Sequence, residues 1–239
     1  MEAAGTPILL VHGMVDNRSV FTLLRHRLRR RGFGRVVTTN YSPLTTDVRA
    51  AADALAEVVE RLTAETGYER VHIIGHSLGG VIARYYVQCR GGDARVHTLV
   101  TLGSPHRGTR WAQLFPHPLL RQLCPGSDLV AELDAPAPDC RTRFVAFWSD
   151  LDQMISPKEH AQVVHPDLAA TNVLVRGVGH LSLPARGSVG RGIAAILAQL
   201  DTAGTALPDD VMPITGRSLD GPYRGGDAGS DPESLASLS

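Results

Sequence analysis

Short apolar runs alternate along the chain with segments whose apolar residues recur at helical spacing. Six of these runs have the length and the β-branched character of strands: residues 8–11, 36–38, 71–74, 96–102, 144–148 and 172–175. Strands that alternate with helices are typical of βαβ units around a mostly parallel sheet. The pattern therefore predicts an α/β fold with a central sheet of about six strands flanked by helices.

The clearest helical pattern follows the second apolar run. Asp47 is a suitable N-cap before it, Gly67 is a suitable C-terminal stop, and the apolar stripe between them consists of Val48, Ala51, Ala52, Leu55, Val59 and Leu62. A last helix is expected over about residues 189–200, packed on the sheet.

Two segments interrupt the alternation. Residues 104–141 carry many prolines and are too long for a simple connection, so they are predicted to form an insertion after the fourth strand, over one edge of the sheet. Residues 205–239 are dominated by Gly, Ser, Pro and Asp, and this composition predicts a disordered C-terminal tail. We expect one domain, residues 1–204, followed by this tail.

The third strand leads into a G-x-S-x-G motif, Gly75-His76-Ser77-Leu78-Gly79, and a helical segment follows it. In this context the serine sits on a tight strand-to-helix turn, where bulk at either glycine would clash with neighbouring backbone. The turn exposes the serine Oγ above the sheet at the N-terminus of a helix. Ser77 is therefore the predicted nucleophile.

A serine hydroxyl needs a neighbouring base to take its proton. The chain has ten histidines, and in enzymes with this turn the partners follow in the order Ser, Asp or Glu, then His. His180 follows the last predicted strand in a loop of small residues, from which an imidazole can reach back over the sheet. His180 is the predicted general base.

The loop after the fifth strand offers two carboxylates for the third position of a triad, Asp150 and Asp152. This acid would hold the imidazole in its useful tautomer and stabilise the imidazolium. Asp152 is favoured because Met154 and Ile155 behind it could anchor the loop. Asp150 stays open as the alternative.

An acyl-transfer intermediate also needs donors for its negatively charged oxygen. One is expected to be the backbone N–H of Leu78, the residue after the nucleophile. The other is expected from the loop after the first strand, where Gly13 lets the backbone turn toward the serine, and the N–H of Met14 is our choice.

Together these motifs resemble those of bacterial triacylglycerol lipases and carboxylesterases of the α/β-hydrolase superfamily. The resemblance spans residues 7–200 and rests on residues 12–14, 75–80, 101–109, 149–152 and 177–180. It implies an α/β-hydrolase fold that cleaves carboxylic esters through an acyl-enzyme on Ser77. In such lipases the Asp of a Ser-x-x-Asp turn is the triad acid, which implies Asp152 because Ser149 precedes it by three residues.

The resemblance also implies that the Gly-Ser-Pro-His segment ending at His106 helps to shape the acyl site. The insertion at residues 104–141 is a candidate partial lid, although ordinary packing over the cleft explains it equally well. The expected substrate contacts are His76, His106, Trp111, Leu114 and Phe115. Acyl transfer, thioester hydrolysis and a catalytically silent binding protein remain alternative functions, because a fold does not fix the chemistry.

Charge narrows the range of partners. Lys plus Arg and Asp plus Glu number 24 each, so the chain has no overall field that would draw it to nucleic acid. The one basic block, residues 25–31, is expected to be the solvated face of a helix, with docking to anionic lipid headgroups as the alternative. The expected partner is a small ester or lipid, with transient contact at a lipid interface but no membrane-spanning segment.

The remaining features leave the cellular context open. Cys89, Cys124 and Cys140 have no metal-ligand spacing, and they are either unpaired thiols or include a Cys124–Cys140 bridge. No Asp, His or Glu cluster has the spacing of metal ligands, so neither a metal nor a cofactor is expected. Residues 1–7 do not read as a secretory signal, which predicts a cytoplasmic protein, or a secreted one whose leader was removed.

Overall fold

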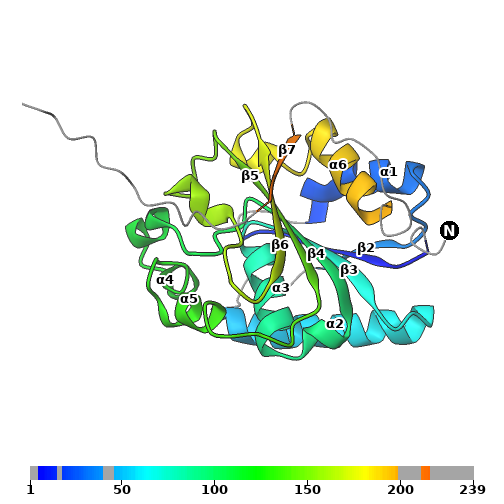
Figure 1. Cartoon of the computed structure of the whole chain (residues 1–239), viewed down its shortest axis with the longest axis horizontal. Coiled ribbons are helices and arrows are strands. Elements are labelled where there is room, and N and C mark those ends of the chain that lie inside the picture. The colour runs from blue at the N-terminus through cyan, green and yellow to red at the C-terminus, as the bar shows by residue number, and fades with distance from the viewer. Residues whose placement is uncertain (1–4, 15–17, 40–45, 199–210, 216–239) are drawn as a thin grey trace, which may run out of the picture.

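The structure is built around one sheet that lies between two layers of helices (Figure 1). The computed structural model describes residues 5–14, 18–39, 46–198 and 211–215. Its strands are β1 (Ile8–Val11), β2 (Val36–Thr39), β3 (Val71–His76), β4 (Val96–Leu102), β5 (Arg143–Ser149), β6 (Ala169–Val175) and β7 (Val211–Thr215). Their order across the sheet is β2-β1-β3-β4-β5-β6-β7, and β1 to β6 run parallel.

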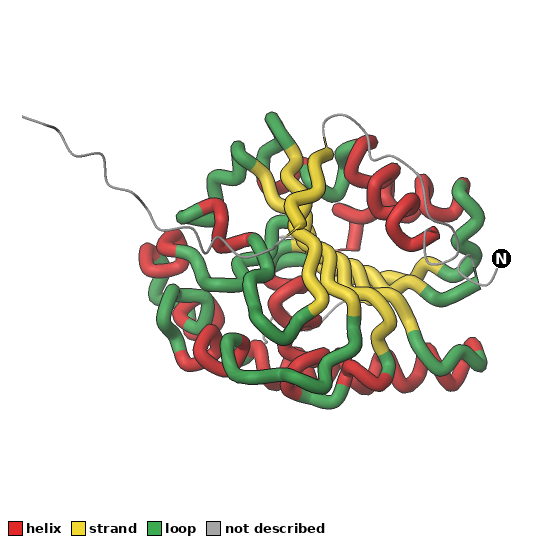
Figure 2. The backbone as a smooth tube through the Cα atoms, viewed as in Figure 1, coloured by secondary structure: helices red, strands yellow, loops and turns green. Residues whose placement is uncertain are grey.

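In the described part of the chain, α-helices and several short 3-10 turns connect these strands (Figure 2). The helices are α1 (Thr22–Arg30), α2 (Val48–Thr66), α3 (Leu78–Cys89), α4 (Pro118–Arg121), α5 (Asp128–Leu133) and α6 (Gly187–Ala198). α1 and α6 cover one face of the sheet, and α2 and α3 cover the other (Figure 1). This arrangement confirms the predicted α/β fold with a mostly parallel sheet.

The buried strands explain why the sequence shows continuous apolar runs rather than strict alternation. In β1, Leu9 and Val11 pack with α2 and α3, whereas Ile8 and Leu10 pack with α1 and α6. Both faces of the strand are therefore buried, as is usual for parallel sheets, and every position is apolar. The same division continues through the central strands and produces two hydrophobic cores, one on each face of the sheet.

The predicted bounds of α2 agree with the structure. The Asp47 side chain accepts a hydrogen bond from the N–H of Arg49, and Gly67 ends the helix in the left-handed conformation with φ of 74°. These are the N-cap and C-cap that the sequence predicts, because local backbone chemistry decides both. The predicted last helix corresponds to α6, and its predicted end at Leu200 lies outside the described residues.

The C-terminal region adds a strand that the sequence analysis did not include. Most of the predicted tail, residues 205–239, lies outside the described residues. Val211–Thr215, however, forms β7 and pairs antiparallel with β6. Backbone hydrogen bonds to the edge of β6 therefore hold these five residues, and disorder of the tail stays a prediction.

The predicted insertion lies between β4 and β5 and consists of short helices rather than one long element. It contains the 3-10 turn Arg110–Leu114 together with α4 and α5, and its buried residues Leu119, Leu129 and Leu133 join the core on the α3 side. The segment is thus packed onto the domain. A lid function for it stays a prediction.

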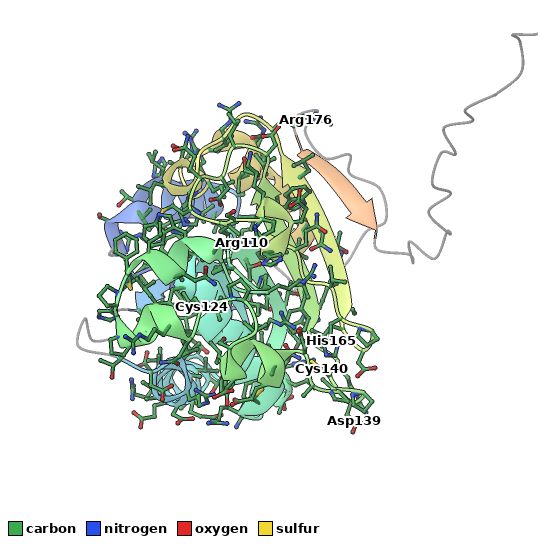
Figure 3. All side chains as sticks on the ribbon, turned by 90° about the vertical axis from the view of Figure 1, so that its left-hand side faces the viewer. Arg110, Cys124, Asp139, Cys140, His165 and Arg176 are labelled. Carbon is green, nitrogen blue, oxygen red and sulfur yellow. The ribbon has the colours of Figure 1, made fainter. Side chains whose placement is uncertain are left out.

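The three cysteines are free thiols, and Figure 3 shows Cys124 and Cys140 at separate places on the molecule. The structure therefore favours unpaired thiols over the bridge. None of the helices described is both long and apolar enough to cross a membrane.

One buried histidine lies far from the predicted site. His72 in β3 is 1% exposed, and neither ring nitrogen has a hydrogen-bond partner among the described residues. Its ring meets that of His97 edge-on, with the ring centroids 5.5 Å apart. Burial, together with the charges of His97 and Arg70, lowers the pKa of His72 to about 3. The folded protein therefore holds this imidazole neutral.

This histidine should make the fold sensitive to acid. In the unfolded chain this histidine has a pKa of about 6.5 and binds a proton below that pH. In the folded protein it binds a proton only below about pH 3, so the free energy of unfolding falls as the pH drops from 6.5 toward 3. Between pH 7 and pH 5 we expect His72 to lower the free energy of unfolding by about 2 kcal/mol, which corresponds to a fall of roughly 4–8 °C in Tm. His72→Leu should remove this part of the loss in thermal melts at the two pH values. The exposed-site variant His26→Leu should retain it, and an equal loss in both variants would contradict the assignment.

Candidate active site

The turn between β3 and α3 holds Ser77 in an unusual backbone conformation. Its φ is 53° and its ψ is −124°, and among the described residues it is the one residue other than glycine with positive φ. The backbone N–H of Ser77 donates to the carbonyl of Leu102 over 2.9 Å, which fastens the turn to the end of β4. A backbone conformation of this kind costs free energy and persists only where the surrounding structure holds it. The motif predicts such a strained turn at the serine.

The two glycines that flank Ser77 permit close backbone contacts. A Cβ at Gly75 would lie 2.4 Å from the Cα of Gly80, and a Cβ at Gly79 would lie 2.3 Å from the carbonyl oxygen of Val11. The first contact closes the turn onto α3. The second presses the start of α3 against the end of β1, which brings the loop after β1 next to the serine.

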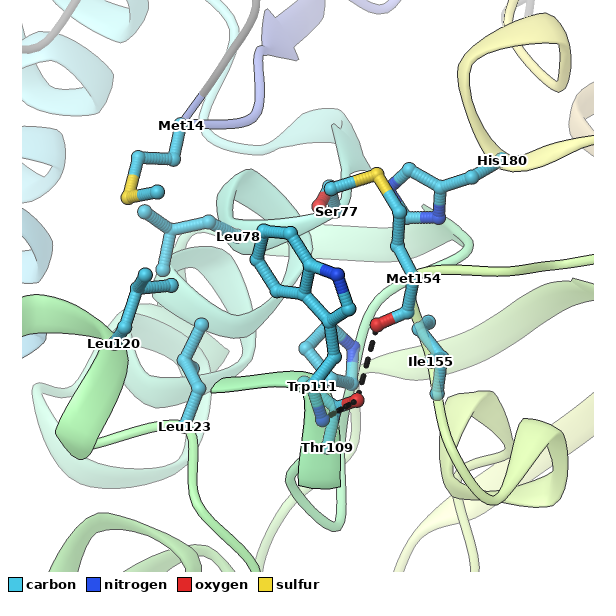
Figure 4. A pocket seen from close by; sticks show the side chains of 11 residues that line it. Met14, Ser77, Leu78, Thr109, Trp111, Leu120, Leu123, Met154, Ile155 and His180 are labelled. Carbon is cyan, nitrogen blue, oxygen red and sulfur yellow. Dashed lines mark hydrogen bonds between the residues drawn. The ribbon is translucent and has the colours of Figure 1, made fainter. Parts of the chain in front are cut away.

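His180 lies in the 3-10 turn that follows β6 (His180–Ser182), and it is 5% exposed. Its Nδ1 is 2.7 Å from Oδ2 of Asp152, whereas its Nε2 is buried and has no hydrogen-bond partner among the described residues. Figure 4 shows the imidazole on the same side of the pocket as Ser77, and both residues line that pocket. A carboxylate that accepts from Nδ1–H leaves Nε2 as the unprotonated nitrogen.

The structure brings Asp152, and not Asp150, to His180. Asp152 is 1% exposed, and its second oxygen accepts from the N–H groups of Met154 at 2.9 Å and Ile155 at 3.1 Å. Asp150 instead accepts from the N–H of Gly177 over 2.8 Å, at the far end of the loop before the histidine. Asp152 therefore has both of its oxygens fixed, one by its own loop and one by the imidazole.

Gly103 closes the site beneath the carboxylate and the imidazole. A Cβ placed on it would lie 3.0 Å from Oδ2 of Asp152 and 3.1 Å from Nδ1 of His180. The end of β4 therefore leaves just enough room for the hydrogen bond between these two side chains.

Leu78 and Met14, whose N–H groups are the predicted donors, line the pocket from different elements. Leu78 begins α3, and the first N–H groups of a helix have no partner within it. Met14 follows β1 and lines the same pocket. His12 Nδ1 is 2.7 Å from the carbonyl of Gly13, and because a trans peptide directs its C=O and N–H to opposite sides, this bond fixes the direction of the Met14 N–H.

The pocket above Ser77 encloses about 400 Å³ of space outside the atoms, part of it open to solvent. Apart from Ser77 and His180 its wall is mostly apolar, and the described residues that form it are Met14, Leu78, Pro105, Thr109, Trp111, Leu120, Leu123, Met154 and Ile155. An apolar wall around Ser77 favours a ligand with a hydrocarbon part.

Of the expected substrate contacts, the structure places one, Trp111, in this pocket. Leu114 and Phe115 are 73% and 41% exposed and do not line it, although Phe115 packs on Trp111 with ring centroids 4.4 Å apart. The 3-10 turn directs Trp111 inward and Leu114 outward. Apolar type in the insertion was therefore not enough to predict which residues reach the site.

The two histidines expected at the substrate are buried behind the site instead. His76 packs on His180 with ring centroids 5.0 Å apart, and its Nε2 is 3.2 Å from the His180 carbonyl. His106 is fully buried, with Nε2 2.9 Å from the hydroxyl of Thr101, and burial together with the charge of Arg84 lowers its pKa well below the usual value. Both histidines support the frame of the site and do not line the pocket.

Several pocket residues were not predicted, and Thr109 shows why. Its hydroxyl donates to the carbonyl of Met154 over 3.0 Å (Figure 4). It also accepts from the N–H of Ser156 over 3.0 Å, so it joins the insertion to the loop after Asp152. The two partners are more than forty positions away in the chain. Met154 and Ile155 were expected to anchor their loop, and the structure also places them in the pocket wall.

Comparisons with known proteins first define the class. The fold, with its serine turn after β3, is that of an α/β-hydrolase. The mature lipase BlEst2 of Bacillus licheniformis aligns with a TM-score of 0.65 at 15% identity, over 82% of this chain and 91% of that chain. The lin2722 gene product of Listeria innocua aligns with a TM-score of 0.62 at 17% identity, over 84% and 96%.

The sequence then gives the family. The family described as palmitoyl protein thioesterase matches residues 7–132, more than half of the chain, and the chain belongs to it. A triacylglycerol lipase of Vibrio cholerae is 33% identical over 113 residues, 45% of this chain and 35% of that protein. One of Pseudarthrobacter phenanthrenivorans is 29% identical over 114 residues, 44% and 35%. The match thus spans about a third of these relatives, and the predicted resemblance to bacterial lipases is confirmed.

Proposed function

We propose that this protein is a serine hydrolase that cleaves carboxylic esters through an acyl-enzyme on Ser77, with His180 as general base and Asp152 as the third member of the triad. One observation carries the proposal. The Nε2 of His180 is buried without a partner among the described residues, its Nδ1 is held by Asp152, and the pocket that it lines also contains Ser77 on a strained turn.

The geometry supports the following first half-reaction. His180 Nε2 takes the proton of Ser77 Oγ as the oxygen attacks the ester carbonyl carbon, and the carbonyl oxygen becomes an anion. The N–H groups of Met14 and Leu78 stabilise this anion, and each such donor contributes on the order of 100- to 1000-fold in rate. When the intermediate collapses, the C–O bond to the alcohol breaks and the His180 imidazolium gives its proton to the leaving oxygen.

The second half-reaction repeats these steps with water. His180 accepts a proton from water as its oxygen attacks the acyl carbon, and the proton then returns to Ser77 Oγ when the acid is released. Asp152 keeps the imidazole in one tautomer and stabilises its charged form throughout. The Asp152 carboxylate suits this role because the N–H groups of Met154 and Ile155 fix its orientation.

The pocket wall supports an apolar acyl chain as the substrate's recognition element. Trp111, Leu120 and Leu123 come from the insertion, and Met154 and Ile155 come from the loop after β5 (Figure 4). Burial of methylene groups against such side chains contributes roughly 0.8 kcal/mol for each group. The triacylglycerol lipases among the relatives act on esters of this kind, which supports the same substrate class here.

Family membership favours thioester hydrolysis as a second candidate. The triad would act in the same way, with a thiolate as leaving group and His180 as its proton donor. Hydrolysis of an oxygen ester and a thioester with the same palmitoyl group distinguishes the two. A kcat/KM that is higher for the oxygen ester supports the first proposal, and a higher value for the thioester supports the second.

A fluorophosphonate probe should label the wild-type protein on Ser77, because it captures a serine whose proton is taken by a neighbouring base. Labelling should disappear in Ser77→Ala, together with hydrolysis of p-nitrophenyl butyrate. Ser104→Ala is the matched control, because Ser104 is buried beside the site at 0% exposure and lies outside the pocket wall. Equal labelling of wild type and Ser77→Ala would remove the nucleophile assignment, and an unlabelled, folded wild type would favour a silent binding protein.

A further inference from the structure

A second pocket lies between the C-terminal half of α1 and the start of α6. These two helices cover the sheet face opposite to α2 and α3 (Figure 1). It encloses about 740 Å³ of space outside the atoms, much of it open to solvent. The described residues that line it are Arg27, Arg30, Arg31, Gly187 and Arg191. Four of these five residues are arginines, and none of the five lines the pocket that contains Ser77.

Some arginines of the fold have carboxylate partners. Arg90 and Arg95 form ion pairs with Asp53 and Glu60 at 2.8 Å. By contrast, none of the guanidinium groups in the pocket has a carboxylate partner within the described part of the chain. The chain as a whole has equal numbers of basic and acidic residues, so the excess of positive charge at this pocket is local.

The arginines also lie close enough to repel one another. Arg27 lies in α1 and Arg31 directly follows the helix, four residues on, a spacing at which like charges on a helix destabilise. Across the gap, Arg27 Nη2 and Arg191 Nη1 lie 3.8 and 3.5 Å from the same point, where a Cβ of Gly187 would be. An anion bound between these groups would replace repulsion by attraction.

The start of α6 adds to this positive character. Gly187 begins the twelve-residue helix, and the N-terminus of a helix presents free N–H groups and the positive end of its dipole. Arg27 is held in place because its Nη1 donates to the carbonyl of Ala185 over 2.6 Å. The other N–H groups of this guanidinium can bind a ligand, and planar guanidinium forks match the oxygens of phosphate.

We propose that this arginine pocket between α1 and α6 binds a phosphate group. The ligand chemistry is that of a phosphate or phosphomonoester carrying about two negative charges, because four guanidinium groups line the pocket and a single carboxylate would leave most of them unpaired. The phosphate comes either from a soluble molecule or from the headgroup of an anionic lipid. This site goes beyond the proposed hydrolase function and does not depend on it.

Inorganic phosphate should raise the Tm of the full-length protein relative to chloride at equal ionic strength. At a concentration about tenfold above Kd we expect a rise of roughly 3–5 °C. The double variant Arg30→Gln/Arg191→Gln should lose this rise, because it removes two cations but keeps the Arg27 contact with Ala185. Arg25→Gln, on the same helix outside the pocket, should keep it.

Vesicles distinguish the two sources of phosphate. The protein is sedimented with vesicles of phosphatidylcholine alone and with vesicles that also contain phosphatidate. Binding to the phosphatidate vesicles that inorganic phosphate competes away, and that the double variant lacks, assigns the site to a lipid headgroup. A thermal rise with phosphate but no vesicle binding assigns it to a soluble phosphate. The proposal is overturned if neither ligand acts, or if the double variant responds like the parent.

Discussion

Asp152→Asn should lower kcat for a soluble p-nitrophenyl ester by roughly 10³- to 10⁴-fold while the protein stays folded. The amide can still accept from the N–H groups of Met154 and Ile155, so the loop keeps its shape. Its NH₂ group, however, would face His180 Nδ1 and force the ring proton onto Nε2. The base would then hold the proton that it must remove from Ser77.

The neighbouring acid provides the control for this experiment. Asp150→Asn should change kcat by less than about tenfold, because an amide oxygen can still accept from the N–H of Gly177 and the side chain does not touch the imidazole. Steady-state kinetics of both variants show which carboxylate supports the imidazole, and circular dichroism verifies that both variants are folded. A larger loss in the Asp150 variant than in the Asp152 variant would show that the wrong carboxylate has been assigned.

Gly79→Ala should destabilise the protein by about 3 kcal/mol or more and lower its Tm by roughly 6–12 °C. The added Cβ would lie 2.3 Å from the carbonyl oxygen of Val11 and 2.4 Å from that of His12. Both contacts are with backbone, which cannot turn aside as a side chain can. Either the start of α3 or the end of β1 must shift, so the N–H groups of Leu78 and Met14 should separate and activity should fall too.

Gly34→Ala is the matched substitution. A Cβ at Gly34 meets nothing within 4 Å, and the backbone there has no positive φ, so the stability should change by less than about 0.5 kcal/mol. Thermal melts of the two variants compare the same chemical change in open and in crowded surroundings. A similar Tm for both would show that the contact between α3 and the end of β1 is not rigid.

The sequence determined the features that depend on local chemistry. Residues buried on both faces of a parallel sheet are apolar at every position, so the strands could be located as short apolar runs, and Asp47 and Gly67 mark the ends of α2 through their own backbone preferences. The serine turn was equally predictable. Its strained conformation needs Gly75 and Gly79, which appear in the sequence at fixed distances from Ser77.

Only the tertiary structure decided which side chains meet across long stretches of sequence. The hydrogen bond of His180 to Asp152 rather than to Asp150 depends on how the loop after β5 folds back, and both carboxylates follow the same strand. The burial of His106 likewise depends on Thr101 and on the packing of Arg84 beneath it. None of these contacts leaves a periodic pattern, because each joins a single pair of residues.

The lining of the two pockets also depends on contacts between segments that are far apart in the sequence. Whether Trp111 or Leu114 enters the pocket at Ser77 is set by one 3-10 turn and its anchor at Thr109, not by hydrophobicity. From sequence, the basic block on α1 is predicted to be an ordinary solvated helix face. In the structure, α6 packs against α1 and places Arg191 and its N-terminus at Gly187 beside the block. A sequence records local preference at every position, whereas a site forms where segments far apart in the chain converge, and that convergence is a property of the packed fold.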